Sequence, residues 1–374
     1  MAALPPLSPS DRKALLALWA VPGLGPVGLA ELGIQVGCRW GELLDLPTGD
    51  WAHLASRADV RGHLLAVGRL GRVAERVEAL AHRGQMQIVY SGDAGYPERL
   101  REISNAPPLL FRLGRPGPPR RRVAMVGSRH PPPEFYLWAR EFAEGVAAGG
   151  AGVVSGAAQG VDSACHFGAL DAGGETWAFL GSALDAVDPG VARVVKRILD
   201  HGGSAFSELP PGVRASRETF PPRNRLISGS ADAVVVLRAA ARSGSFHTAE
   251  AALAQKRPLL AVPGEAARAD AAGSNRMLAV GSARACVRPE DALRAAGVLA
   301  VPPPPAVSPA VEVDPAELSA AARTAFASLS REPRSFEDVQ CASRLDPGVL
   351  ASALCELELL GLVQVGPGKY YERV

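Results

Sequence analysis

Short apolar runs alternate with helical segments from about residue 107 to residue 263, and this alternation restricts the possible folds more than any other feature. Runs such as VAMV (123–126), VVVL (234–237) and LLAV (259–262) are apolar at every position. Continuous apolar runs are typical of strands that are buried on both faces, as in parallel sheets covered by helices. The pattern predicts an α/β fold with a doubly wound, mostly parallel sheet.

The segment before this region is predicted to be helical through residue 104. Ser8 or Ser10 is expected to cap the first helix. A turn rich in proline and glycine at 22–26 precedes a second helix. This turn is similar to a helix-hairpin-helix turn, whose N–H groups can meet a phosphate, but it also fits a plain glycine turn in a helical bundle.

The chain is therefore expected to divide into three folded segments and a linker. Residues 1–104 form the helical segment and residues 105–297 the sheet domain. Residues 298–315 are rich in proline, which favours an extended, semi-rigid linker. Residues 316–374 predict three helices and a hairpin, which is the outline of a winged-helix domain.

Charge is distributed unevenly, although the net charge of the chain is only +2. Residues 105–297 carry 23 basic and 17 acidic side chains, whereas residues 298–374 carry 6 and 10. A basic middle fits an anionic ligand, and an acidic tail fits a protein partner better than nucleic acid. The 5 cysteines include no C-x-x-C pair, so neither a zinc site nor a disulfide framework is predicted. No signal peptide or membrane-spanning stretch is recognised, which predicts a cytoplasmic protein without membrane contact.

Three turns made of small residues follow predicted strands, at 127–129, 155–160 and 242–248. The carboxyl ends of parallel strands meet at one edge of a sheet, where ligands bind in open α/β folds. Each turn also precedes a helix, so it offers backbone N–H groups and a positive helix end. That combination suits a phosphate group.

Arginines accompany these turns. Arg129 leaves the first strand, and its planar guanidinium can hold two phosphate oxygens at once. Arg223 and Arg225 flank Asn224 on a predicted helix, so their side chains point to different faces. One is expected to reach a ligand while the other pairs with a carboxylate, and Glu208 is placed to orient an arginine.

Structural roles also explain several of these residues. Each turn alone fits either packing or phosphate binding. Asp162 is predicted to cap a helix rather than to act as a catalytic acid. His166 is predicted to be a packed residue inside a helix.

Five motifs occur in order along the middle of the chain: VAMVGSR, VVSGAAQGVDSACHFGAL, FPPRNRLISG, SGSFHTAEAA and AVPG. Together they closely resemble the DprA/Smf family, the DNA-processing proteins of natural transformation. The resemblance implies an extended Rossmann-like fold that binds single-stranded DNA in a basic pocket. It also implies an N-terminal SAM-like domain, a C-terminal winged helix, dimerisation, protection of incoming single strands, and loading of RecA onto strands coated by single-strand-binding protein.

The motifs also carry over a set of expected contacts with single-stranded DNA. Phosphate binding is expected at Arg129, helped by the backbones of the first two turns, at the RNR motif and at the SGS-x-x-T turn. The predicted residues are Gly127, Ser128, Arg129, Ser155, Gly156, Gln159, Gly160, Arg193, Lys196, Arg223, Asn224, Arg225, Ser243, Gly244, Ser245 and Thr248.

The chain departs from the family pattern at three places. Gln159 stands where an arginine is usual, which removes a charge from the expected pocket. The segment DAVDPGVAR replaces the usual Tyr-Pro and downstream Asn, which is expected to relocate a contact to Arg193 or Lys196. His247 stands where an aliphatic residue is common.

An enzyme is the main alternative, because phosphoribohydrolases related to the lysine-decarboxylase-like family share the GSR-type opening. Their catalytic glutamate corresponds to Ala251 here, and Glu250 lies about 100° away around the helix. No G-x-G-x-x-G motif or GK[ST] motif indicates a dinucleotide or P-loop site. We therefore predict a DNA-binding protein that is not an enzyme and that uses no cofactor or metal.

Overall fold

The computed structural model describes residues 7–37, 39–115, 117, 120–299, 318–330, 334–360, 362–366 and 370–373. Residues 1–300 form one compact unit and residues 301–374 a second. Apart from its first two residues, the predicted linker 298–315 lies outside the described residues.

In the described part of the first unit, nine strands form one sheet, in the order β1-β2-β6-β5-β4-β3-β7-β8-β9. Neighbours are parallel from β6 through β9, while β1 and β2 add an antiparallel edge. The strands are β1 Gln87–Tyr90, β2 Leu109–Gly114, β3 Arg122–Gly127, β4 Gly152–Ser155, β5 Thr176–Phe179, β6 Ser204–Ser207, β7 Ala233–Arg238, β8 Leu259–Ala261 and β9 Arg284–Ala285. The predicted doubly wound, mostly parallel sheet is confirmed.

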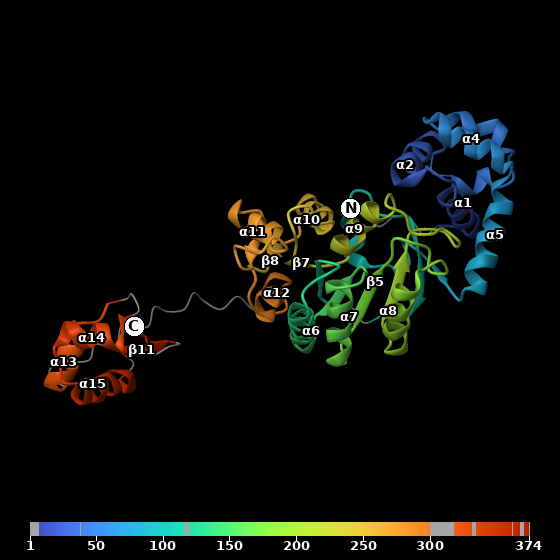
Figure 1. The fold of residues 1–374 in the computed structure, drawn as a ribbon. Helices are drawn as coiled ribbons and strands as arrows, with labels where there is room; N and C mark the ends of the chain where they lie inside the picture. The colour runs from blue at the N-terminus through green and yellow to red at the C-terminus, as the bar shows by residue number, and fades with distance from the viewer. Residues whose placement is uncertain are drawn as a thin grey trace. The chain divides into compact units, whose positions relative to one another are not determined.

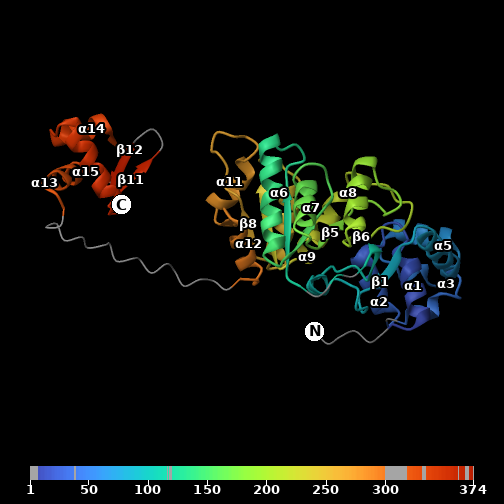
Figure 2. The same ribbon diagram turned by 90° about the horizontal axis from the view of Figure 1, so that it is seen from below.

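Helices cover both faces of this sheet. The helices α6, α7 and α8 lie in a row on one face, as both views show (Figure 1) (Figure 2), and α12 packs beside α6. The helices α9, α10 and α11 pack on the opposite face. Their bounds are α6 Pro133–Ala148, α7 Val161–Asp171, α8 Pro189–Asp200, α9 Phe220–Gly229, α10 Ser245–Ala254, α11 Ala272–Ala279 and α12 Pro289–Ala295.

The central strands supply a core to each face because successive side chains point to opposite sides of the sheet. Val123 and Met125 of β3 belong to the cluster that includes α6 and α7. Ala124 and Val126 belong to the cluster that includes α9 and α10. All four are buried, which accounts for the continuous apolar run VAMV within β3.

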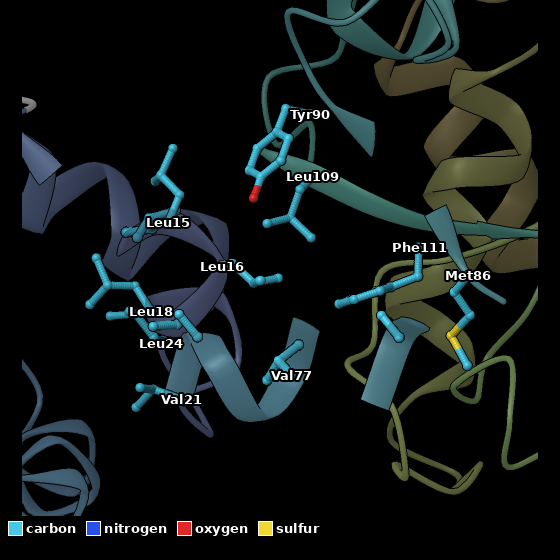
Figure 3. Close-up of a cluster of buried hydrophobic side chains, with 14 of the residues drawn as sticks. Leu15, Leu16, Leu18, Val21, Leu24, Val77, Met86, Tyr90, Leu109 and Phe111 are labelled. Atoms are coloured by element: carbon cyan, nitrogen blue, oxygen red, sulfur yellow. The ribbon is translucent and has the colours of Figure 1, made fainter. Parts of the chain in front are cut away.

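The N-terminal helices share a hydrophobic core with the antiparallel edge of the sheet. Figure 3 shows Leu15 and Leu16 of α1 in the same cluster as Leu109 and Phe111 of β2. Ser8 caps α1 by accepting a hydrogen bond from the Asp11 N–H at 3.1 Å, as predicted. These elements are α1 Pro9–Trp19, α2 Gly25–Gln35, η1 Trp40–Leu43, α3 Thr48–Trp51, η2 Ala52–Leu54, α4 Ala58–Val67, α5 Leu70–Arg83 and η3 Glu98–Glu102.

The prediction of helix through residue 104 is wrong at β1. Residues 87–90 pair with β2 and extend the large sheet. The run QIVY is too short to predict a strand by itself, and the strand that it pairs with, β2, begins about twenty residues further along the chain. Whether residues 1–104 and 105–297 are separate domains stays a prediction.

The second unit has the predicted order of three helices followed by a hairpin. Its helices are α13 Ala320–Ala327, α14 Phe336–Ser343 and α15 Pro347–Leu359. In its described part, β10 Arg334–Ser335, β12 Tyr370–Arg373 and β11 Val363–Gly366 form an antiparallel sheet in that order. The predicted winged helix is confirmed, while the tip of its hairpin lies outside the described residues. Across the described residues, no helix combines the length and apolar character needed to cross a membrane.

Candidate nucleic-acid interface

The order of the strands creates a crevice at β3. Strand β4 pairs with one side of β3 and β7 with the other. The connection after β3 therefore leads to β4 on one side, whereas the connection after β7 leads to β8 on the other. Open α/β sheets bind their ligands at such a switch point, beyond the carboxyl ends of the strands. The three predicted turns follow β3, β4 and β7, so they lie along this one edge, which we call the rim.

The first two turns pack directly against each other. The Val161 N–H donates to the Ser128 carbonyl at 3.0 Å. Gly160 has φ +87°, and a Cβ at this position would lie 2.5 Å from the Ser128 and Arg129 carbonyl oxygens. Only glycine therefore allows the turn after β4 to approach the turn after β3 this closely.

Buried side chains bind the backbone of the turn after β4. Asp162 is 7% exposed and accepts a hydrogen bond from the Gly156 N–H at 3.2 Å. The predicted helix cap is therefore wrong, because Gly160 is the N-cap residue of α7, no side chain caps it, and Asp162 binds the preceding turn. Burial raises the pKa of Asp162, and the nearby Arg223 opposes this rise.

His166 is fully buried, as predicted, and supports the same turn. Thr176 Oγ1 donates its one proton to the Val153 carbonyl at 3.0 Å. It must therefore accept in its contact with His166 at 2.7 Å, so His166 Nδ1 carries a proton and is the donor. Nε2 is then free to accept from the Ala157 N–H at 3.3 Å. Burial, together with Arg223, lowers the pKa of His166 from 6.5 to about 3. The imidazole is therefore neutral, and protonation of Nε2 would oppose the Ala157 N–H.

Arg223 connects α9 to the rim. Its side chain is 4% exposed, and Nη1 donates to the Gly156 carbonyl at 2.8 Å and to the Phe179 carbonyl. Burial lowers the pKa of Arg223 to about 10, while Asp162 acts in the opposite direction. Asn224 Nδ2 contacts the Gly244 carbonyl at 3.4 Å and so connects α9 to the third turn.

Hydrogen bonds within the third turn hold it at the start of α10. Ser243 Oγ accepts from the Ser245 N–H at 3.3 Å, and the Ser243 carbonyl accepts from the Phe246 N–H at 3.2 Å. Gly244 is exposed, and a Cβ there would meet nothing within 4 Å. The backbone of Gly244 is therefore accessible at the rim. By contrast, the predicted contact residue Thr248 is only 1% exposed.

One pocket of about 620 Å³ collects half of the predicted residues. An adjoining pocket of about 260 Å³ includes Arg129, Gly156 and Gln159, and a third includes Arg129, Gln159 and Gly160. The predicted residues that line the pocket of about 620 Å³ are Gly127, Arg129, Arg223, Asn224, Ser243, Gly244, Ser245 and Thr248.

Five predicted residues are not brought to these pockets. Ser155 is 0% exposed, and its hydroxyl donates to the Met125 carbonyl at 2.6 Å. Arg225 does not line these pockets and forms a partly buried ion pair with Glu208 at 2.6 Å. Arg193 and Lys196 lie exposed on α8, where Lys196 pairs with Asp200 at 2.6 Å. Ser128 is half-buried and positions the His130 N–H through its hydroxyl.

Three arginines at the rim have no carboxylate partner among the described residues. Arg129, Arg217 and Arg242 line the pocket of about 620 Å³ and are exposed. Within the described residues, none of them forms an ion pair. Sequence reasoning missed Arg217 and Arg242. Arg242 directly precedes the SGS motif, and this position could have indicated a role at the site. Arg217 is next to no motif, and only the tertiary structure places it at the pocket.

Phe220 is a further rim residue that sequence reasoning missed. Its ring lies 5.0 Å from the Arg129 guanidinium carbon and 5.6 Å from that of Arg223. Phe220 lines both the pocket of about 620 Å³ and the adjoining one of about 260 Å³. It is the first residue of the FPPRNR motif, so the motif contained a signal for an aromatic side chain beside the cations.

The fold and the rim define a Rossmann-like protein whose switch point presents uncompensated guanidinium groups and an aromatic ring. Residues 87–297 match the family model of DNA recombination-mediator protein A, and residues 304–369 match the DprA winged helix domain. The chain belongs to the DprA/Smf family of DNA-processing proteins.

Individual relatives agree with this assignment. The DNA processing protein DprA of Mycobacterium tuberculosis is 32% identical over 326 residues, which cover 82% of each chain. The structure of DprA from Streptococcus pneumoniae is 27% identical, covers 77% of this chain and 98% of that chain, and superposes with a TM-score of 0.61. A structure of the Helicobacter pylori protein, described for its single-stranded DNA binding mode, is 26% identical, covers 56% of this chain and 94% of that chain, and has a TM-score of 0.49.

Gly160→Ala is expected to destabilise the protein by about 1–3 kcal/mol or more, because the new Cβ meets two carbonyl oxygens at a φ that only glycine adopts readily. Urea unfolding measures this loss. Gly190→Ala is the control, because a Cβ there meets nothing within 4 Å. Equal stability of Gly160→Ala and wild type would contradict the packing of the two turns.

Acidification is expected to remove a stabilising contribution of His166. Because its folded pKa of about 3 lies below 6.5, the unfolded chain binds the proton first as the pH falls. Below pH 6.5 the stability advantage of wild type over His166→Gln should shrink by about 1.4 kcal/mol per pH unit. Urea unfolding of both proteins from pH 7 to pH 5 tests this. An advantage that does not change with pH would contradict a neutral buried imidazole.

Proposed function

We propose that the rim binds single-stranded DNA without sequence preference. The observation that carries this proposal is the set of exposed arginines Arg129, Arg217 and Arg242 around one pocket, without carboxylate partners among the described residues. Guanidinium groups bind phosphate oxygens in pairs, and contacts to phosphates carry no sequence information. The membership of the chain in a family of DNA recombination mediators supports the same function.

Unpaired DNA fits this site better than a duplex. Phe220 gives a base a ring to stack on, and stacking of this kind accepts any base because every base has a π face. In a duplex, the bases are already stacked and paired, so they are not available to Phe220. The backbone of a single strand also bends easily toward a pocket of about 620 Å³ at the edge of the sheet.

The rim is proposed to bind DNA without acting on it. Among the described residues, Asp162 is the carboxylate that lines the pocket of about 620 Å³, and it accepts a hydrogen bond from the Gly156 N–H. Glu250, the nearest equivalent of the catalytic glutamate of phosphoribohydrolases, has a side chain that is 72% exposed and lies 3.7 Å from His247. An exposed carboxylate that does not line the pocket is poorly placed for general acid or base catalysis.

The proposed role in the cell is to protect incoming single strands and to load RecA onto them during transformation and recombination. The family resemblance supports RecA and single-strand-binding protein as partners and a cytoplasmic location. A homodimer would place two rims on one strand and raise the apparent affinity without new contacts. The edge strand β9, with Val280 67% exposed and Val287 56% exposed beside it, supports a dimer contact in the region 270–297.

Arg129→Ala is expected to weaken binding of a mixed-sequence single strand by about 10- to 100-fold, because it removes a charge-assisted contact with phosphate. Fluorescence anisotropy with the single strand and with its duplex measures the effect, and wild type should prefer the single strand. Arg193→Ala is the matched control. It removes an exposed arginine from α8 and should change the affinity less than about threefold. Equal losses in the two variants would disprove the assignment of the rim.

Phe220→Leu is expected to weaken binding of the same single strand by about 5- to 100-fold, because the substitution keeps an apolar side chain but removes the stacking surface. An abasic oligonucleotide of equal length provides the control, since it has phosphates but no bases to stack. Its affinity should be nearly the same for Phe220→Leu and wild type. If both oligonucleotides lose affinity equally, Phe220 supports the fold of the rim and does not stack on bases.

A further inference from the structure

A second polar pocket lies at the opposite edge of the large sheet. Its volume is about 560 Å³, and it includes Arg122 at the first position of β3 and Asp232 immediately before β7. Trp177, near the start of β5, also lines it. These are the amino ends of the parallel strands, whereas the rim lies at their carboxyl ends.

Buried carboxylates hold arginines around this pocket. Asp232 has a side chain that is 5% exposed, and it pairs with Arg121 at 2.7 Å and with Arg99 at 3.1 Å. Glu175 has a side chain that is 8% exposed, and it pairs with Arg122 at 3.3 Å and with Arg120 at 3.5 Å. Each carboxylate therefore orients two guanidinium groups from the inner side.

The outer sides of these guanidinium groups remain accessible. The side chains of Arg99, Arg120 and Arg121 are 33%, 32% and 56% exposed. A guanidinium has five N–H donors, and one or two contacts with carboxylates leave donors available. The pocket therefore offers convergent N–H groups that the carboxylates hold in position but do not saturate.

The remaining charges near the pocket leave an excess of cations. Glu102 is shared by Arg99 and Arg257, each at 2.8 Å, and Glu98 also lines the pocket. The four carboxylates Glu98, Glu102, Glu175 and Asp232 thus face the five arginines Arg99, Arg120, Arg121, Arg122 and Arg257. An anion that enters the pocket meets a net positive environment.

Ser230 provides an independent indication of a ligand. It lines the pocket, it is 2% exposed, and within the described residues its hydroxyl has no hydrogen-bond partner. The hydroxyl of Ser228, two residues earlier in α9, donates to the Arg225 carbonyl. Buried hydroxyl groups nearly always find a partner, because an unmade hydrogen bond costs free energy. A bound oxyanion would accept this hydrogen bond.

We propose that this pocket, defined by Arg99, Arg120, Arg121 and Ser230, binds a phosphate group. The planar forks of several arginines match the oxygens of a phosphate better than a single point charge does. The phosphate can belong to a small phosphorylated molecule or to a segment of DNA that extends beyond the rim. This proposal does not depend on the function of the rim.

Calorimetric titration of the full chain with inorganic phosphate tests the proposal in a background where the rim is weakened by Arg129→Ala and Arg242→Ala. We expect saturable binding in this background. Adding Arg120→Ala and Arg121→Ala should lower the affinity at least about tenfold, and adding Ser230→Ala should lower it about three- to tenfold. Adding Arg193→Ala is the control and should change nothing.

The proposal is overturned if the background protein does not bind phosphate, or if Arg193→Ala lowers the affinity as much as the pocket variants do. Thermal unfolding without phosphate shows whether each variant is folded. The partly exposed Arg121 is the preferred single variant if the double variant does not fold.

Oligonucleotides of about 6 and about 30 nucleotides then distinguish the two sources of the phosphate, a small phosphorylated molecule and a segment of DNA. If the pocket variants lose affinity for the longer oligonucleotide alone, the phosphate belongs to DNA. If they lose affinity for neither oligonucleotide, the phosphate belongs to a small molecule.

Discussion

The turn between β4 and α7 is held by three buried polar side chains, and the rest of the rim depends on this arrangement. Asp162 binds its Gly156 N–H, Arg223 binds the Gly156 carbonyl, and His166 binds the Ala157 N–H. A buried backbone group that loses its partner costs free energy, so each of these side chains fixes the turn strongly. The turn after β3 packs on this one through Gly160, and Arg129 is thereby positioned beside the pocket.

This arrangement separates two kinds of arginine that the sequence presents together. Arg223 is buried and the Arg225 side chain is only 11% exposed, and the two hold α9 in place, Arg223 against the turn and Arg225 against Glu208. Arg129, Arg217 and Arg242 are exposed and carry the charge that an anionic ligand meets. Residues of one chemical type thus build the site in some positions and face the ligand in others, and burial decides between the two roles.

Much of the fold could be predicted from the sequence because its signals are local. Continuous apolar runs indicate strands that are buried on both faces, and β3 and β7 are examples. The antiparallel strand β1 escaped prediction because only its pairing with β2 makes it a strand. The shared core of α1 and β2 is also non-local, and no periodicity within either segment indicates it (Figure 3).

The site was predictable to the extent that motifs define it. The three turns, Arg129 and Asn224 meet at one edge because strand ends in a parallel sheet must do so. The spacing of Arg223 and Arg225 predicted that they diverge, but the rotation of α9 that decides which one turns inward depends on tertiary packing. Phe220 reaches the pocket from the first position of α9 and Arg217 from the loop before it, and Ser155 is buried with its hydroxyl donating to the Met125 carbonyl of β3. None of these three outcomes has a local signal strong enough to predict it.

The dependence of single-strand affinity on salt tests the central claim most directly, because it counts the phosphates that rim cations neutralise. A plot of log affinity against log salt should be linear for wild type, with a slope of about −0.7 for each phosphate contacted. Replacing Arg129 with alanine should make that slope shallower by about 0.7, since one contact is lost. A wild-type affinity that does not respond to salt, or an unchanged slope in the variant, would contradict the account.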